Sequence, residues 1–165
     1  MARASRAKIS CSDIADRYAF IYCIHAIVSI GANIKCEAVY IGQTRNRFGA
    51  IGRLSQHLSN DDTCNTFKQR VRAIYNAEEN LTDISFIVCP FSPLKPFLLD
   101  SPDYREAVEA IVQDKIIQCI VKQNLKMGVV SRISYNAYMR ERFVQDEANA
   151  ISKTIVSWIH EIGSK

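Results

Sequence analysis

The sequence lacks long apolar runs, and no stretch reaches the roughly 18 consecutive apolar residues that a membrane-spanning helix needs. The basic first ten residues are followed by no apolar segment, so we expect neither a signal peptide nor a membrane partner. Paired cysteines are also lacking. The six cysteines lie far apart, with no Cys-x-x-Cys pair and no Cys/His cluster at zinc-site spacing, which indicates a reduced, intracellular protein.

Glycine and proline are scarce, at six and four of 165 residues, and no low-complexity tract or internal repeat is present. With 48% hydrophobic and 23% charged residues, the composition is that of a globular protein rather than a disordered one. A chain of this length can bury a real core, so we expect one domain over residues 1–165.

The positive charge is small overall but locally concentrated. The net charge of +4 is by itself a weak sign of a nucleic-acid partner. Most of the excess falls between residues 45 and 72, where it is suited to contacts with a DNA backbone. The residues predicted to make such contacts are Arg45, Arg47, Lys68, Arg70 and Arg72; for the last three, a solvated helix flank is the alternative.

The periodicity of apolar residues predicts a sheet-and-helix protein. Strands are expected at residues 18–28, 36–41 and 81–89, and the first two should pair as an antiparallel hairpin. Helices are expected at 13–17, from about 50 to 58, after the capping segment 61–63, from Pro102 to about Lys122, and at 136–162. The apolar residues expected to pack from two of these helices are Phe67, Val71, Ile74 and Tyr75, and then Phe143, Ala150, Ile151, Ile155 and Trp158.

Four side chains are expected to converge where the hairpin meets the next helix. Arg53 and His57 are four residues apart, hence on one helix face, and Tyr40 lies near the end of its strand. Hairpin pairing can bring Tyr22 onto the same sheet surface, whereas His25 alternates to the other face and is assigned no role, nor is His160.

These residue types suit phosphodiester hydrolysis, which needs a base for the attacking water, a cation for the phosphate charge and a metal near the leaving oxygen. Arg53 is the expected cation. Either tyrosine could be the base if positive charge favours its phenolate, and His57 could polarise that phenol or take its proton.

Phe20-Ile21-Tyr22, Tyr40-Ile41-Gly42 and the Arg53/His57 pair together resemble the GIY-YIG nuclease family. The resemblance covers about residues 19–136, with 1–18 and 137–165 as additions, and Phe20 replaces the family's first glycine. It implies an α+β fold, a small three-stranded antiparallel sheet flanked by helices, here with an added C-terminal helix. It also implies a cytoplasmic endonuclease, in a bacterial or phage-infected cell.

The resemblance further implies a glutamate on a later helix that holds Mg²⁺ or Mn²⁺, and Gln113 occupies the corresponding position. A carboxamide lacks the charge that binds a hard cation. Three interpretations stay open: an inactivating Glu-to-Gln substitution, a naturally inactive or unusual member, or Glu109 as the metal ligand, one turn earlier on the same flank. Asn136 resembles the family's late asparagine, which would contact a phosphate or orient the metal ligand.

The sequence therefore predicts a metal-dependent endonuclease that cuts double-stranded DNA, and a homodimer or higher homo-oligomer is compatible with this prediction. The alternative is a catalytically inactive nucleic-acid-binding or regulatory module on the same scaffold. A nuclease acting on RNA or structured DNA is a third interpretation, because phosphate chemistry is the same in either polymer.

Overall fold

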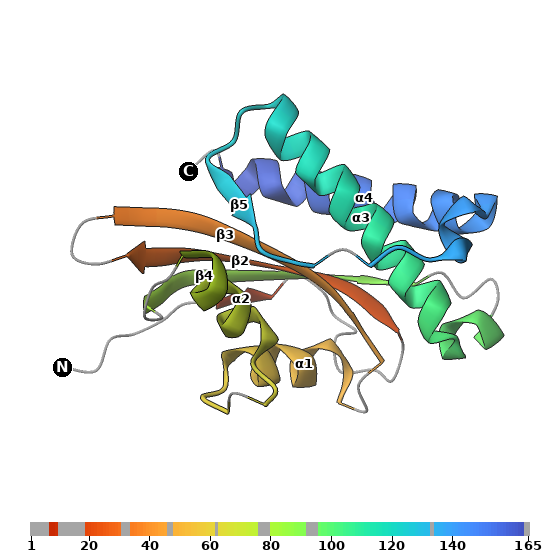
Figure 1. Cartoon of the computed structure of the whole chain (residues 1–165), viewed down its shortest axis with the longest axis horizontal. Helices are drawn as coiled ribbons and strands as arrows, with labels where there is room; N and C mark the ends of the chain where they lie inside the picture. Colours follow the sequence, from red (N-terminus) through yellow and green to blue (C-terminus); the bar gives the residue numbers. More distant parts are fainter. Residues whose placement is uncertain are drawn as a thin grey trace.

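A mixed sheet lies between two layers of helices in the computed structural model (Figure 1). The structure describes residues 7–9, 19–30, 34–45, 48–61, 63–75, 80–91, 96–132 and 134–163; the predicted helix at 13–17 lies outside these ranges. The strands are β1 (Ala7–Ile9), β2 (Phe20–Ile30), β3 (Ile34–Thr44), β4 (Asn80–Pro90) and β5 (Met127–Val129). The helices are α1 (Gly49–Leu58), α2 (Thr66–Tyr75), α3 (Pro102–Lys122) and α4 (Arg142–Gly163), with short 3-10 helices η1 (Pro96–Asp100) and η2 (Ala137–Arg140).

The α+β class is confirmed, but the prediction of a three-stranded antiparallel sheet is wrong. The sheet has five strands in the order β1-β4-β2-β3-β5. The three predicted strands form its antiparallel centre as β4, β2 and β3, while β1 pairs parallel with β4 and β5 pairs parallel with β3. Each added edge strand has only three residues, too few for an alternating pattern to be recognised in the sequence.

The helices cover the two faces of the sheet unequally. α3 and α4 lie together on one face, and the shorter α1 and α2 lie on the other (Figure 1). α3 begins as predicted, because the Ser101 hydroxyl accepts a hydrogen bond from the Tyr104 amide at 3.4 Å. No helix in the described part of the chain is long and apolar enough to cross a membrane.

Three details of the predicted helices are corrected. The C-terminal helix begins at Arg142, not at 136, because η2 comes first and Glu141 between them is extended. Ile74 is exposed although it was expected to pack, since α2 rests on the sheet mainly through Phe67 and Val71. Ala150 is likewise exposed on α4.

The alternation of side chains along β2 and β3 divides the interior into two cores. One core, under α3 and α4, contains Ile21, Cys23 and Ile41. The other, under α1 and α2, contains Tyr22 and Tyr40, so the two tyrosines share one sheet surface as the sequence predicts.

Candidate active site at the tyrosine cluster

The hairpin register places a glycine beside the two tyrosines. Tyr22 lies directly opposite Gly42, two residues beyond Tyr40 on β3. A Cβ atom at Gly42 would lie 2.6 Å from Cζ of Tyr22 and 3.0 Å from Cε1 of Tyr40. The absence of a side chain at Gly42 therefore makes the room in which the two rings come to 6.2 Å between centroids.

His57 is fixed in one tautomer at this cluster. The Tyr22 hydroxyl lies 2.6 Å from His57 Nε2, and the Phe67 backbone amide donates to His57 Nδ1 at 3.1 Å. Because Nδ1 accepts from an N–H group, the ring proton is on Nε2, and His57 donates to the Tyr22 oxygen. His57 is fully buried, so this arrangement has no competition from water.

Burial, together with the charge of Arg53, lowers the pKa of His57 to about 3. The imidazole is therefore neutral near pH 7, with its only proton directed at Tyr22. This geometry fits the expectation that His57 polarises a phenol. It does not fit the expectation that His57 takes the proton of Tyr22, because Nε2 is already protonated.

Arg53, on α1, is held in place by one hydrogen bond within its own helix and one to α2. Its guanidinium donates to Gln56 Oε1 at 3.0 Å and to Thr66 Oγ1, at the start of α2, at 3.4 Å. Burial acts to lower the pKa of Arg53, but Tyr22 and Tyr40 raise it beyond its usual value. Arg53 is thus a permanent positive charge beside both tyrosines.

The two phenols are not equivalent. Burial, followed by the influence of Tyr40, raises the pKa of Tyr22 well above its usual range. Burial and Glu109 also raise the pKa of Tyr40, whereas Arg53, a hydrogen bond from Tyr22 and Arg70 lower it. Although Arg53 also acts to lower the pKa of Tyr22, burial raises that pKa further than it raises the pKa of Tyr40, so Tyr40 is the phenol that ionises first.

Gln113, at the position where the resemblance implies a glutamate, is almost fully buried in α3. Its Nε2 donates to the backbone carbonyl of Ile41 at 3.2 Å and to Glu109 Oε1 at 2.9 Å. Its Oε1 is buried and finds no hydrogen-bond partner among the described residues. Gln113 thus joins Glu109 to the strand that carries Tyr40, with one amide oxygen left over.

Glu109 is the carboxylate that acts on the tyrosine cluster. It contributes to the raised pKa of both Tyr22 and Tyr40. Burial and the charge of Glu106 raise its own pKa to about 8, against the influence of Arg53. Glu109 lines a pocket with Gln43, further along β3 than the residues with which β5 pairs, and its charge acts on the tyrosines from there.

This small pocket has a volume of about 240 Å³, and Gln43, Glu106, Glu109, Gln113, Arg132 and Ser134 are among the residues that line it. The donor set fits a hard cation, since carboxylate and amide oxygens are the ligands that Mg²⁺ prefers, and Mg²⁺ commonly uses one or two carboxylates with water and phosphate. In the described chain no three His, Cys, Asp or Glu side chains are grouped so that they could hold a metal ion.

The other residues predicted for the site include Asn136, Arg45 and Arg47, and the structure gives the first two contacts with other parts of the chain. Asn136 caps η2 through the Tyr138 amide and donates to the Asp103 carbonyl at 2.8 Å, so its side chain holds η2 on the start of α3. Arg45 pairs with Asp100. Arg47 lies outside the described residues.

The basic residues of α2 differ from one another. Lys68 donates to Asn60 at 3.0 Å, on the connection between α1 and α2. The positive charge of Arg70 lowers the pKa of Tyr40. Of the residues predicted to contact DNA, Arg70 is therefore one that the fold brings near the tyrosine cluster. Arg72 is exposed near the end of the helix.

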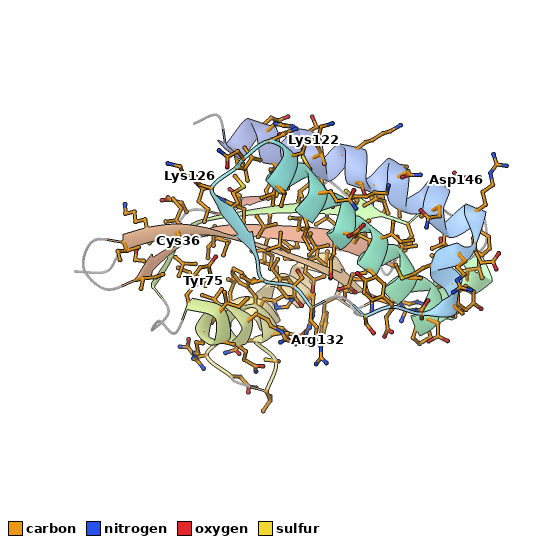
Figure 2. All side chains as sticks on the ribbon, turned by 45° about the horizontal axis from the view of Figure 1, so that its top comes forward. Cys36, Tyr75, Lys122, Lys126, Arg132 and Asp146 are labelled. Atoms are coloured by element: carbon orange, nitrogen blue, oxygen red, sulfur yellow. The ribbon has the colours of Figure 1, made fainter. Side chains whose placement is uncertain are left out.

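Two groups of residues at the site were not predicted from the sequence. Glu106, Gln43 and Arg132 line the pocket beside Glu109, and Arg132 extends outward from the segment after β5 (Figure 2). The spacing of Glu106, Glu109 and Gln113 at three and four residues is a signal that could have placed Glu106 on the same helix flank. The Phe67 amide, which sets the tautomer of His57, carries no signal in the sequence.

No family model matches this sequence, and neither a curated protein nor a solved structure does.

Proposed function

We propose that the protein is a metal-dependent endonuclease of the GIY-YIG type that hydrolyses phosphodiester bonds of double-stranded DNA. The observation that carries the proposal is the cluster in which neutral His57 donates to Tyr22 and the Tyr22 ring stacks on Tyr40, beside the charge of Arg53. A phenol beside a guanidinium, whose positive charge favours the phenolate, has a feature of a general base.

Tyr40 is the base in this proposal, and Tyr22 and His57 are positioning residues. Tyr40 would take a proton from the attacking water as a phenolate, a form that burial disfavours and that the charges of Arg53 and Arg70 favour. Arg53 would stabilise the charge that develops on the phosphate, and Arg70 would add a second positive charge on the same side.

Glu109 is the proposed metal ligand, and the Gln113 amide nitrogen holds its Oε1 by a hydrogen bond. Of the three interpretations of Gln113, this one makes the chain active as it stands, because the ionised form of Glu109, which a bound cation would favour, has the charge that the carboxamide lacks. A bound Mg²⁺ or Mn²⁺ would supply Lewis acidity toward the leaving oxygen.

Incubation of supercoiled plasmid with the protein and Mg²⁺, followed by separation of nicked and linear products, tests the enzyme hypothesis. Tyr40→Phe is expected to lower the rate by about 100-fold or more, because it removes the base. Tyr135→Phe, at a tyrosine that is 69% exposed, is the matched control and should cut like the wild type. Equal cutting by Tyr40→Phe would mean that another group takes the proton.

The metal assignment is tested with two variants in the same assay. Glu109→Gln is expected to abolish cutting, and Gln113→Glu should leave the wild-type protein's activity in place or raise it. Cutting only by Gln113→Glu would instead place the ligand at 113 and show that the present sequence is an inactivated nuclease. A parallel reaction with RNA in place of plasmid shows whether the protein cuts DNA or RNA.

A second candidate function is a non-cutting nucleic-acid-binding module. The observation that favours it is that Gln113 is engaged by the Ile41 carbonyl and Glu109 rather than open to a metal. Retained plasmid binding, with no cutting by the wild type or by Gln113→Glu, would support this module against the enzyme.

A further inference from the structure

A second pocket lies on the opposite face of the sheet from the tyrosines. It has a volume of about 610 Å³ and is bounded by β2, β3, β4 and the end of α4. Its polar lining includes His25, Glu37, Asp83 and Glu161, and its apolar lining is Ile27 and Ile162. This volume is within the range of about 300–1,000 Å³ that small-molecule pockets occupy.

His25 is a buried side chain with unused hydrogen-bonding capacity in the wall of this pocket. It is only 6% exposed, and its Nε2 lies 2.9 Å from Glu37 Oε2. To donate to the carboxylate, Nε2 must carry a proton, which leaves Nδ1 of the neutral ring as an acceptor. No described residue pairs with this Nδ1.

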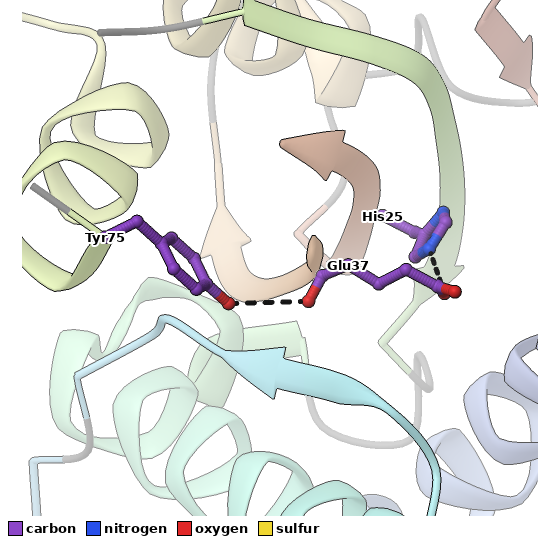
Figure 3. Close-up of polar contacts among 3 residues, drawn as sticks. All are labelled: His25, Glu37 and Tyr75. Atoms are coloured by element: carbon purple, nitrogen blue, oxygen red, sulfur yellow. Dashed lines mark hydrogen bonds and ion pairs between the residues drawn. The ribbon is translucent and has the colours of Figure 1, made fainter. Parts of the chain in front are cut away.

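Glu37 is held in position from the other side of the sheet. Tyr75, at the end of α2, donates to the Glu37 backbone carbonyl at 3.4 Å, while the Glu37 side chain accepts from His25 (Figure 3). The backbone and the carboxylate of Glu37 are therefore both engaged. These two hydrogen bonds fix Glu37 in the wall of the pocket.

The charge of the pocket is negative. Glu37, Asp83 and Glu161 come from three different elements, and the described lining includes no lysine or arginine. These carboxylates and His25 do not form a group that could hold one metal ion, since no such group of three exists in the described chain. The carboxylates are therefore spread around the pocket, whose wall also includes apolar side chains.

We propose that this pocket binds a small aliphatic amine with two or more ammonium groups. Separated ammonium groups can reach carboxylates that are too far apart for a single metal ion, and a methylene chain can lie against Ile27 and Ile162. One ammonium group would pair with the Glu37 carboxylate, which His25 holds in the wall of the pocket. The site is separate from the tyrosine cluster, so it does not depend on the proposed nuclease activity.

Isothermal titration calorimetry of the full chain with putrescine (butane-1,4-diamine) tests this site. Asp83→Asn and Glu161→Gln each remove one negative charge; Asp83 has a φ of 50°, a conformation that asparagine tolerates well. Asp146→Asn is the matched control, because Asp146 is an exposed residue near the beginning of α4, away from Lys122 and the end of the helix (Figure 2).

We expect one putrescine per chain, with affinity lowered about tenfold or more in each pocket variant and unchanged in Asp146→Asn, since a hydrogen bond to a charged group contributes on this order. Butylamine should bind at least tenfold more weakly than putrescine. Long-range ¹H–¹⁵N spectra should show the ring nitrogen signals of His25 shifting on addition of putrescine, a readout that does not need a variant.

Three results would overturn the proposal: no putrescine binding, equal affinity in all variants, or equal binding of butylamine and putrescine. Mg²⁺ that competes with putrescine and loses affinity in the same variants would make the pocket a metal site instead. Melting curves of both variants identify any loss of affinity that comes from unfolding.

Discussion

Among single residues, Gly42 has the strongest influence on the tyrosine cluster although it contributes no functional group. It stands opposite Tyr22 and two residues after Tyr40, in the space that a Cβ atom would otherwise fill. The sequence motif Tyr40-Ile41-Gly42 therefore has a packing explanation besides the proposed catalytic one. The tyrosines, Arg53 and His57 could be predicted from the sequence because strand alternation and helical spacing determine which side chains share a surface.

Gly42→Ala tests this explanation. The added methyl group would be 2.6 Å from Tyr22 Cζ, so Tyr22 must move away from His57, and we expect a loss of roughly 1–3 kcal/mol in the free energy of unfolding. Denaturant unfolding measures the loss. Gly163→Ala is the control, because its nearest neighbour is the flexible end of Met127 at 3.2 Å. A Gly42→Ala protein as stable as the wild type would contradict the packing argument.

The tautomer of His57 leads to a prediction that separates its two ring nitrogens. His57→Gln can keep an N–H donor near Tyr22, whereas His57→Asn can keep an acceptor for the Phe67 amide but loses the donor. If the donor to Tyr22 supports catalysis, the Gln variant should retain more plasmid cutting than the Asn variant. The reverse order would show that the contact with α2 matters more than polarisation of the phenol.

The same histidine predicts a pH dependence of stability. Its pKa is about 3 in the folded protein and about 6.5 in the unfolded chain, so the unfolded state binds more protons between these values. Stability from this group is complete above pH 6.5 and falls as the pH is lowered toward 3. Unfolding experiments at pH 7 and pH 4 should therefore show a larger acid loss for the wild type than for His57→Gln.

At the scale of elements, the edge of β3 is the part of the fold that leaves the weakest trace in the sequence. β5 pairs with this edge over three residues, and the hydroxyl of Tyr75 from α2 reaches the Glu37 carbonyl beside it. Short strands and contacts between distant segments have no periodicity in the sequence, which explains why the long elements were predicted and the edge strands were not. The start of α4 was missed for a related reason: the side chain of Asn136 caps η2 and delays the helix.

The junction of α2, β3 and β5 can be tested with a double-mutant cycle. A Cβ atom at Gly128 would collide with the Tyr75 hydroxyl, so Gly128→Ala should be destabilising by roughly 1–2 kcal/mol. Tyr75→Phe removes the hydroxyl, and a protein with this change should tolerate Gly128→Ala much better than the wild type does. Additive losses in the double variant, measured by denaturant unfolding, would mean that Tyr75 and Gly128 are independent.

At the scale of the whole molecule, the candidate site spans both faces of the sheet. The tyrosines lie under α1 and α2, while Glu109 comes from α3 on the other face and acts on them around the edge of β3. β5 ends opposite Val39 and Ser131 then hydrogen-bonds to the Ile41 backbone, so Glu109 lies against the edge of β3 further along, beside Gln43. Sequence patterns predict which face a side chain takes, but not that a helix on one face can serve a site on the other.

Because of Glu109, the stability of the protein should depend on pH and on a bound metal ion. Its pKa is about 8 in the folded protein against about 4.3 in the unfolded chain, so the folded state binds more protons between these values. Stability from this group is therefore present at pH 4 and is lost as the pH rises toward 8. We expect Glu109→Gln to be more stable than the wild type at pH 8, by roughly 1–3 kcal/mol after allowance for solvent screening, and about equal at pH 4.

Because a hard cation binds the ionised carboxylate, Mg²⁺ should offset this loss. Addition of Mg²⁺ is expected to raise the melting temperature of the wild type at pH 8 but not at pH 5, and to leave Glu109→Gln unchanged at both. Asp146→Asn, which changes an exposed carboxylate, should respond to Mg²⁺ like the wild type. An equal rise in melting temperature in Glu109→Gln would place the metal elsewhere. If the wild type loses stability as the pH rises and Mg²⁺ does not restore it, the non-cutting module is supported, because the Glu109 carboxylate would then be buried without binding a metal.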